Sequence, residues 1–434
     1  MKAEKKNQRY KIVLASITLI KIYTQIFLTG IFRSSKLIHQ NMKLKPVQPK
    51  AFFNTRLFLL LVYTIYFSCT LAVGIFAFKR PHYNWDMLAY MAIVIKMEHP
   101  DATVAQLHTD TYKAAKENIP APEYKLLTDS THAYRKKMAE DPFAFYGQLP
   151  FYVIKPLYTG SVYLFHKSGF TLPASTVLPS IIGYLLIGLL LFYWLRKYLP
   201  LLIAFVAGLL IMFSIYMVNI AGYSSPDYLS AFFLFSAIYY IMEKPSIRMM
   251  FFFFLLSLFT RIDNIITCFL MLFFLKFFDT RDSEVSRKHY LLMLFILVAS
   301  YFTITGMTTP NLGWNILYYP RFIHYFNLSR AFEPTFSPGA YISLFYSQAL
   351  TGIVSTHFTI FLFLALLQVS YPLPIQFKKF TFEQRFSLLL IGIILVRFVL
   401  FPDLDDRFYI AFYLAILILL IKKIKQLHWP QNSI

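Results

Sequence analysis

Long apolar runs separated by short basic segments constrain the fold of this chain more than any other feature. The runs at 57–78 and 177–194 have the length that an α-helix needs to cross a bilayer. Of the 434 residues, 57% are hydrophobic and only 15% are charged, which excludes an ordinary soluble domain. The sequence therefore predicts an all-α, polytopic protein that has the lipid bilayer as a partner.

Counting the apolar runs from residue 57 onward gives about ten transmembrane helices with both termini cytoplasmic. Basic residues in alternate loops set this orientation, because cytoplasmic loops are enriched in Lys and Arg. We therefore expect residues 57–434 to form a multi-pass domain in the inner (cytoplasmic) membrane. The basic segment 1–56 contains another apolar run at 12–32. That segment is cytoplasmic, carries an eleventh membrane helix, or lies upstream of the native start.

A long mixed segment, 79–176, follows the first run and is predicted to lie at the outer face of the membrane. Within it, 86–97 and 102–118 have the pattern of amphipathic helices. The stretch 151–170 is apolar and aromatic but includes Lys155, which favours a helix lying in the membrane interface. We expect this outer loop to carry juxtamembrane helices.

The net charge of +21 does not predict a nucleic-acid partner, because Lys and Arg gather in the short segments between apolar runs. Cys69 and Cys268 both lie within apolar runs, so they predict neither a disulfide framework nor a metal cluster. No His-rich or paired-carboxylate spacing identifies a metal site. The residues themselves therefore call for no cofactor.

The apolar stretch 249–278 is too long for one simple span and too short for two, and Arg261 and Asp263 stand at its middle. Two short helices that meet at a polar tip explain this pattern. In the predicted topology the tip lies on the same outer face as Asp86 and Arg407. Ionisable groups at the ends of spans are costly to keep there, so each is a functional candidate.

Asp86 directly follows the first span and is the candidate catalytic residue. A carboxylate at this place acts as a general base when it takes the proton of an acceptor hydroxyl. The alternative is that Asp86 caps a helix that begins at Met87. Asp227 has the same two interpretations, binding substrate or capping a helix, because it stands directly before another apolar run.

The remaining candidates are predicted to bind substrate. Arg261 and Asp263 either contact a substrate or form a structural ion pair at the helix break, and Arg407 has acidic neighbours that leave the same two alternatives. Lys155 either extends its ammonium group to the membrane interface or contacts a phosphate. A lipid phosphate that leaves during a transfer reaction needs such cations to meet its growing negative charge.

Several short motifs resemble those of the GT-C class of integral membrane glycosyltransferases. Asp86 is similar to the acidic residue that follows the first span in that class, and residues 225–227 look like its acidic position after the third span. The stretch 258–263 is similar to its Thr-Arg/Lys-Pro-Asp turn, with Ile262 where proline is commoner. Residues 406–409 resemble its Arg-Tyr entry to a late span.

The resemblance runs from about residue 57 onward and implies an inverting glycosyltransferase. Its donor would be a polyprenyl-phosphate-linked sugar, its acceptor a cell-envelope glycan or lipid, and its base Asp86. Many members carry two acidic residues in the first loop, whereas Trp85 and Met87 flank Asp86 here, so dependence on a divalent metal ion stays open. The alternatives are a polytopic transporter or flippase of lipid-linked glycans, and a non-catalytic envelope assembly protein.

Overall fold

A computed structural model describes residues 56–129, 131–279, 286–307, 337–370 and 380–428. The chain divides into two compact units, 1–61 and 62–434, and the account below concerns the second unit. The basic segment before residue 56, with its apolar run, lies outside the described residues.

The described residues are helical, with one isolated β-bridge between His82 and Tyr223, so the all-α prediction is confirmed. The first helices are α2 (Arg56–Lys79), α3 (Asp86–Glu98), α4 (Val104–Asn118), α5 (Ala121–Leu127), α6 (Ala133–Glu140), α7 (Pro142–Gly147), α8 (Pro150–Val153) and α9 (Pro156–Lys167). They are followed by α10 (Leu172–Leu195), α11 (Leu201–Met212), α12 (Ile215–Ala221), α13 (Asp227–Met242), α14 (Ile247–Thr260), α15 (Asn264–Phe277) and α16 (Arg287–Gly306). The last are α18 (Pro338–Ser355), α19 (Phe358–Ser370), α20 (Phe382–Leu400), the short 3-10 helix η2 (Asp406–Phe408) and α21 (Ile410–His428).

Three described helices, α2, α10 and α16, are long and apolar enough to cross a bilayer. The number rises to five if each of the bent pairs α11–α12 and α18–α19 forms one span. Helices α13, α14 and α15 are also apolar but shorter than a full span. By length and composition, the described residues thus contain three to five candidate membrane spans, which suggest a membrane protein.

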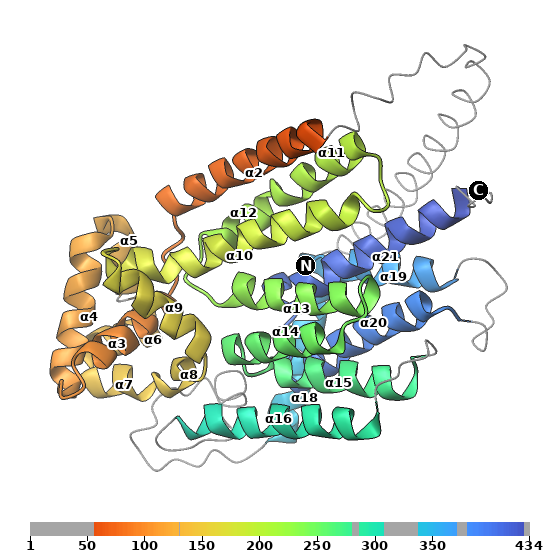
Figure 1. Cartoon of the computed structure of the whole chain (residues 1–434). Helices are drawn as coiled ribbons and strands as arrows, with labels where there is room; N and C mark the ends of the chain where they lie inside the picture. Colours follow the sequence, from red (N-terminus) through yellow and green to blue (C-terminus); the bar gives the residue numbers. More distant parts are fainter. Residues whose placement is uncertain (1–55, 130, 280–285, 308–336, 371–379, 429–434) are drawn as a thin grey trace, which may run out of the picture. The chain divides into compact units, whose positions relative to one another are not determined.

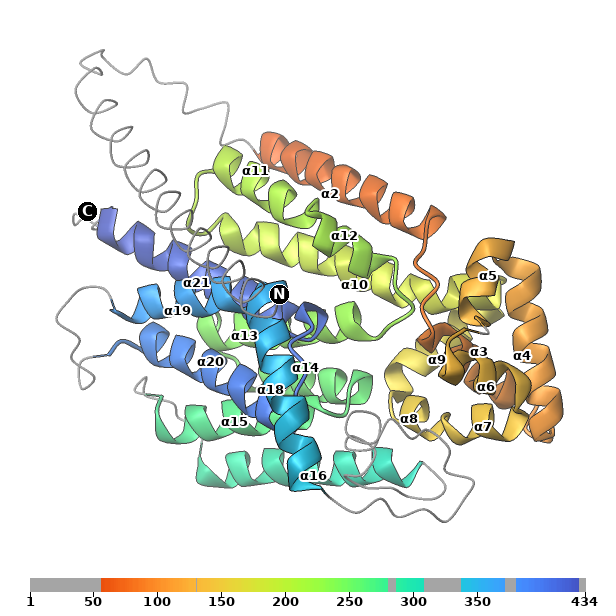
Figure 2. The same ribbon diagram turned by 180° about the vertical axis from the view of Figure 1, so that it is seen from behind.

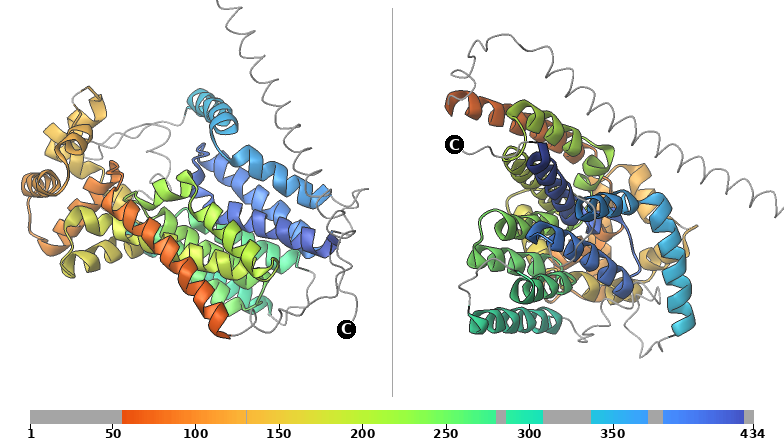
Figure 3. Two further views of the ribbon diagram at one scale, coloured as in Figure 1. Left: turned by 90° about the horizontal axis from the view of Figure 1, so that it is seen from above. Right: turned by 90° about the vertical axis from the view of Figure 1, so that its right-hand side faces the viewer.

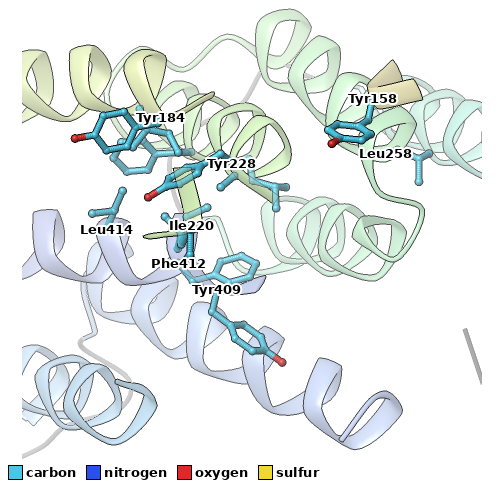
Figure 4. Packing of buried hydrophobic residues seen from close by; sticks show 14 of the residues in the cluster. Tyr158, Tyr184, Ile220, Tyr228, Leu258, Tyr409, Phe412 and Leu414 are labelled. Atoms are coloured by element: carbon cyan, nitrogen blue, oxygen red, sulfur yellow. The ribbon is translucent and has the colours of Figure 1, made fainter. Parts of the chain in front are cut away.

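Helix α13 lies at the centre of the second unit. It packs against α10, α14 and α21, and nearly all of its residues are buried, as expected for a helix that is apolar on every side (Figure 1). Seen from behind, α10, α13, α14 and α15 again run side by side (Figure 2). Figure 4 shows the aromatic rings that fill the interior between these helices, with Tyr184 and Tyr228 among them.

The segment from α3 to α9 gathers at one end of the long helices (Figures 1 and 3). Helices α3 and α9 pack against each other, and both pack against α10. The helices predicted at 86–97 and 102–118 are present, as α3 and α4. The expectation that the first is amphipathic is wrong, because its residues from Met87 to Ile95 are all buried between α4, α8, α9 and α10.

Three apolar stretches, at 151–170, 201–220 and 341–369, are each divided into two helices or more. The stretch 151–170 is interrupted at Lys155, since the following Pro156 disfavours helical backbone in the residue before it. The run at 201–220 bends by 60° at Ser214, whose side chain caps α12. The run at 341–369 is divided into α18 and α19. By contrast, the predicted break in 249–278 is confirmed, because α14 ends at Thr260 and α15 begins at Asn264.

Candidate functional site

Asp86 is the first residue of α3, and its carboxylate is held from a distant part of the chain. Its Oδ1 atom accepts a hydrogen bond of 2.9 Å from the Tyr152 hydroxyl in α8. The helix-capping alternative is not supported, because the cap position belongs to Trp85 and no side chain caps this helix end. Among the described residues Tyr152 is the hydrogen-bond partner of this carboxylate, so Oδ2 remains open to a ligand.

Residues just before Asp86 join its segment to the loop that precedes α13. The Asn84 side chain accepts a hydrogen bond of 3.0 Å from the Ser224 amide and donates one of 3.4 Å to the Ser224 carbonyl. The His82 amide donates to the Gly222 carbonyl at 3.0 Å. These contacts span about 140 positions of sequence and bring the start of α3 beside the start of α13.

Asp227 begins α13 and is almost fully buried, with 3% of its surface exposed. Its side chain caps no helix; instead Oδ1 forms an ion pair with the Arg261 guanidinium. Upstream, the Ser180 hydroxyl in α10 donates to the carbonyls of Tyr223 and Ser225, both at 2.7 Å. The loop before α13 is therefore fixed by α10, and it presents Asp227 to the tip between α14 and α15.

The predicted polar tip holds a chain of alternating charges. The Arg261 guanidinium contacts both oxygens of Asp263, at 3.0 and 3.1 Å, as well as Asp227. A second arginine of this charge network is Arg397, in the last turn of α20. Its guanidinium pairs with Asp263 and donates a hydrogen bond of 3.0 Å to the side-chain oxygen of Asn264. Burial opposes ionisation of Asp263, but Arg261 and Arg397 hold the pKa of its carboxyl well below the usual range.

Arg407 extends this network from η2. Its guanidinium lies 3.0 Å from Oδ2 of Asp405 and 3.7 Å from Oδ2 of Asp227. The Phe408 ring packs near two guanidinium groups, with its centroid 4.4 Å from the guanidinium carbon of Arg261 and 4.8 Å from that of Arg407. The structural alternative for Arg407 and Arg261, pairing with acidic neighbours, therefore holds, although pairing does not prevent contact with a ligand.

Lys155 stands between α8 and α9 and does not extend away to solvent. Its ammonium group donates a hydrogen bond of 2.8 Å to the Tyr90 hydroxyl and lies 4.8 Å from the centroid of the Tyr152 ring. Burial lowers the pKa of Lys155 to about 8, and the nearby carboxylate of Asp86 limits that fall. At neutral pH the side chain is still mainly cationic.

One cavity of about 240 Å³ joins these groups. Its charged walls are Asp86, Lys155, Arg261, Asp263, Arg397 and Asp403, which come from four separate parts of the chain, at 86, 155, 261–263 and 397–403. Its apolar walls include Phe151, Phe401, Phe408 and Tyr409. The volume is below the 300–1,000 Å³ typical of sites for drug-sized ligands, so it suits a small polar group such as one sugar or phosphate.

All six predicted site residues belong to this arrangement. Asp86, Lys155, Arg261 and Asp263 line the cavity, while Asp227 and Arg407 support it through ion pairs. Two further residues, Arg397 and Tyr152, were not predicted. The sequence does mark Arg397 as a candidate, since it is the one charged residue in the apolar run 386–401, where a charge is expensive. No sequence pattern marks Tyr152, because its role depends on contact with Asp86.

Metal ligation does not fit this donor set. Across the described residues, no three His, Cys, Asp or Glu side chains lie together as a metal site. The two other carboxylates of the cavity are Asp263, which is paired with Arg261 and Arg397, and Asp403, while Asp86 accepts a hydrogen bond from Tyr152. Comparisons of this chain with known protein families, with curated proteins and with solved structures find no match.

Proposed function

We propose that this chain is a membrane glycosyltransferase of the inner membrane, with about ten membrane helices. It moves a sugar from a polyprenyl-phosphate donor to a cell-envelope glycan or lipid acceptor at the outer face. One observation carries the proposal: a carboxylate with an open oxygen and three cationic side chains line the same small cavity. A transfer reaction with an anionic leaving group requires both elements within the reach of one substrate.

In this proposal Asp86 accepts the proton of the acceptor hydroxyl while the oxygen bonds to the anomeric carbon of the sugar. The bond from that carbon to the phosphate oxygen breaks, and its electron pair leaves with the lipid phosphate. Lys155, Arg261 and Arg397 meet the charge that grows on the phosphate oxygens. Attack from the face opposite the leaving group inverts the anomeric centre, and no step requires a metal ion.

The proposal that the site lies at one face of the membrane is supported by where the helices begin and end. Helices α3, α13 and α15 begin at the cavity or its ion pairs, and α14 and α20 end there. The charged groups therefore collect at one end of the apolar helices and do not line a path between the two ends, as expected for an enzyme acting at one membrane face. In the proposed orientation, with cytoplasmic termini, this is the outer face.

The test of this function is the Asp86→Asn variant. Purified protein in lipid nanodiscs is given a radiolabelled polyprenyl-phosphate sugar and candidate acceptors, and the labelled product is measured. We expect Asp86→Asn to reduce transfer by roughly 10²- to 10⁴-fold, the usual contribution of a general base. The matched control is Asp101→Asn, which changes the same group at an exposed position outside the cavity and should transfer sugar like wild type.

The remaining outcomes separate the alternatives. Equal transfer by wild type and Asp86→Asn would remove Asp86 from the role of base. Movement of a lipid-linked glycan across vesicle membranes without a covalent product would identify a transporter or flippase. If neither transfer nor movement is found with a broad set of lipid-linked donors, the non-catalytic assembly protein becomes the better description.

A further inference from the structure

A second cavity, of about 500 Å³, lies between α15 and α16. Each helix contributes one face to it, because the lining residues recur every three or four positions. On α15 the apolar members are Phe269, Leu272, Phe273 and Phe277, and on α16 they include Leu291 and Leu294. Its volume falls within the range of ordinary small-molecule sites.

Both charged residues of this cavity lie at one end. Lys276 is in the last turn of α15, and Arg287 is the first residue of α16, which packs against α15. Among the described residues, neither cation pairs with a carboxylate; the Lys276 ammonium instead lies 5.3 Å from the centroid of the Tyr290 ring. The cavity is therefore cationic at one end and apolar along the rest of its length.

This cavity is separate from the candidate active site. Asn264, at the polar tip, is the first residue of α15, and Lys276 comes twelve residues later, so the two ends are about 18 Å apart at 1.5 Å per helical residue. In Figure 2, α15 and α16 lie side by side in the lower part of the view, and α11 lies in the upper part. The groups that bind at one cavity do not reach the other.

The apolar walls of this cavity are partly exposed at the surface of the protein. This exposure indicates which class of ligand fits. Phe273 and Phe277 on α15 and Leu291 on α16 are between 46% and 66% exposed, and α16 is one of the candidate membrane spans. A soluble anion would use the cations but would leave these apolar walls uncovered. An anionic amphiphile that already lies in the bilayer covers both.

We propose that this cavity binds an anionic membrane phospholipid. The phosphodiester of its head group lies between Lys276 and Arg287, and one acyl chain lies along the apolar faces of α15 and α16. Two charge-assisted contacts hold the head group, and burial of the chain adds the apolar contribution. In the proposed topology this end of α15 is cytoplasmic, the face where anionic lipids attract basic residues. The lipid site goes beyond the proposed transfer reaction and does not depend on it.

The test measures lipid binding, not sugar transfer. Full-length protein in neutral detergent is titrated with phosphatidylglycerol, phosphatidylcholine or glycerol phosphate, and bound lipid is counted by native mass spectrometry. We expect phosphatidylglycerol to bind most tightly. The variant Lys276→Gln/Arg287→Gln should weaken its binding about 30-fold, from about 1 kcal/mol for each basic residue.

A matched control keeps the change in net charge the same. Arg248→Gln/Lys288→Gln removes two exposed basic residues that do not line the cavity and should bind lipid like wild type. Leu294→Trp, which fills the apolar part and keeps both cations, should also weaken binding. Equal affinity for the neutral and the anionic lipid would overturn the proposal. So would equal losses in the cavity and control variants, or displacement of the lipid by glycerol phosphate at similar concentration.

Discussion

At the scale of single residues, the charges of the candidate site depend on one another. Asp263 lies between Arg261 and Arg397, and Asp227 pairs with Arg261. Buried charges of this kind are tolerated because each has a partner, and removing one partner leaves the other without compensation. The same network keeps the guanidinium groups in place at the wall of the cavity, so stability and function share these residues.

The Arg397→Gln variant tests this dependence. It removes a charge from the last turn of α20 and leaves the buried carboxylate of Asp263 with one arginine in place of two. We expect the free energy of unfolding to fall by about 3–5 kcal/mol, the usual cost of breaking a buried ion pair. Thermal unfolding in detergent measures the change as a lower Tm.

The same substitution at Arg385 is its control, because both arginines lie in α20. Among the described residues, Arg385 makes one long hydrogen bond, of 3.4 Å, to the Phe278 carbonyl, so Arg385→Gln should change the free energy of unfolding by less than about 1 kcal/mol. Similar Tm values for the two variants would show that Arg397 does not hold the charge network together.

At the scale of elements, the site depends on helices that begin or end where two chain segments approach closely. The contact between α10 and α13 is an example in which backbone meets backbone. A Cβ atom at Gly183 in α10 would lie 2.6 Å from the backbone nitrogen of Leu229 and 2.6 Å from the backbone carbon of Tyr228. Only glycine permits this approach, which holds the first turn of α13, and with it Asp227, beside α10.

Gly183→Ala is therefore expected to separate α10 from α13. Backbone atoms yield less easily than side-chain ends, so the free energy of unfolding should fall by about 1–3 kcal/mol, as in other overpacked interiors. Gly392→Ala in α20 is the control, because nothing lies within 4 Å of its added Cβ, and the higher helix propensity of alanine should raise stability by up to about 1 kcal/mol. Equal Tm changes of the same sign would contradict the close contact.

At the scale of the whole molecule, the proposed function depends on which side of the membrane the cavity faces. Ten membrane helices with cytoplasmic termini place one helix before residue 101 and nine between 101 and 426. An odd number of crossings puts these two positions on opposite sides. The three to five spans defined by length and composition alone leave the shorter apolar helices to be assigned by experiment.

Single cysteines at positions 101 and 426 test this topology in a Cys69→Ser/Cys268→Ser background. Asp101 and Gln426 are both exposed, so Asp101→Cys and Gln426→Cys should accept a thiol reagent readily. We expect a membrane-impermeant maleimide to label position 101 in intact cells and position 426 only after permeabilisation. Labelling of both positions in intact cells would require an even number of crossings between them and would contradict the ten-helix arrangement.

The sequence by itself determined the features that depend on local composition. Apolar runs showed that the chain is helical and suited to a membrane, and the charges within 249–278 located the break between α14 and α15. Asp86 and Asp227 were recognisable as candidates because each stands beside an apolar run, and Arg261 because it stands within one, where an ionisable group is costly. Each of these signals lies within a few residues of the feature that it predicts.

Only the tertiary structure decided which of these groups meet. Asp263 pairs with Arg397 across 134 positions, and Asp86 bonds to Tyr152 across 66, and nothing in either local sequence names the partner. The burial of α3 on all sides was missed for the same reason, because it results from helices that pack around it. Charge pairing and burial depend on the approach of distant segments, and that approach is a property of the packed helices, not of any one stretch of chain.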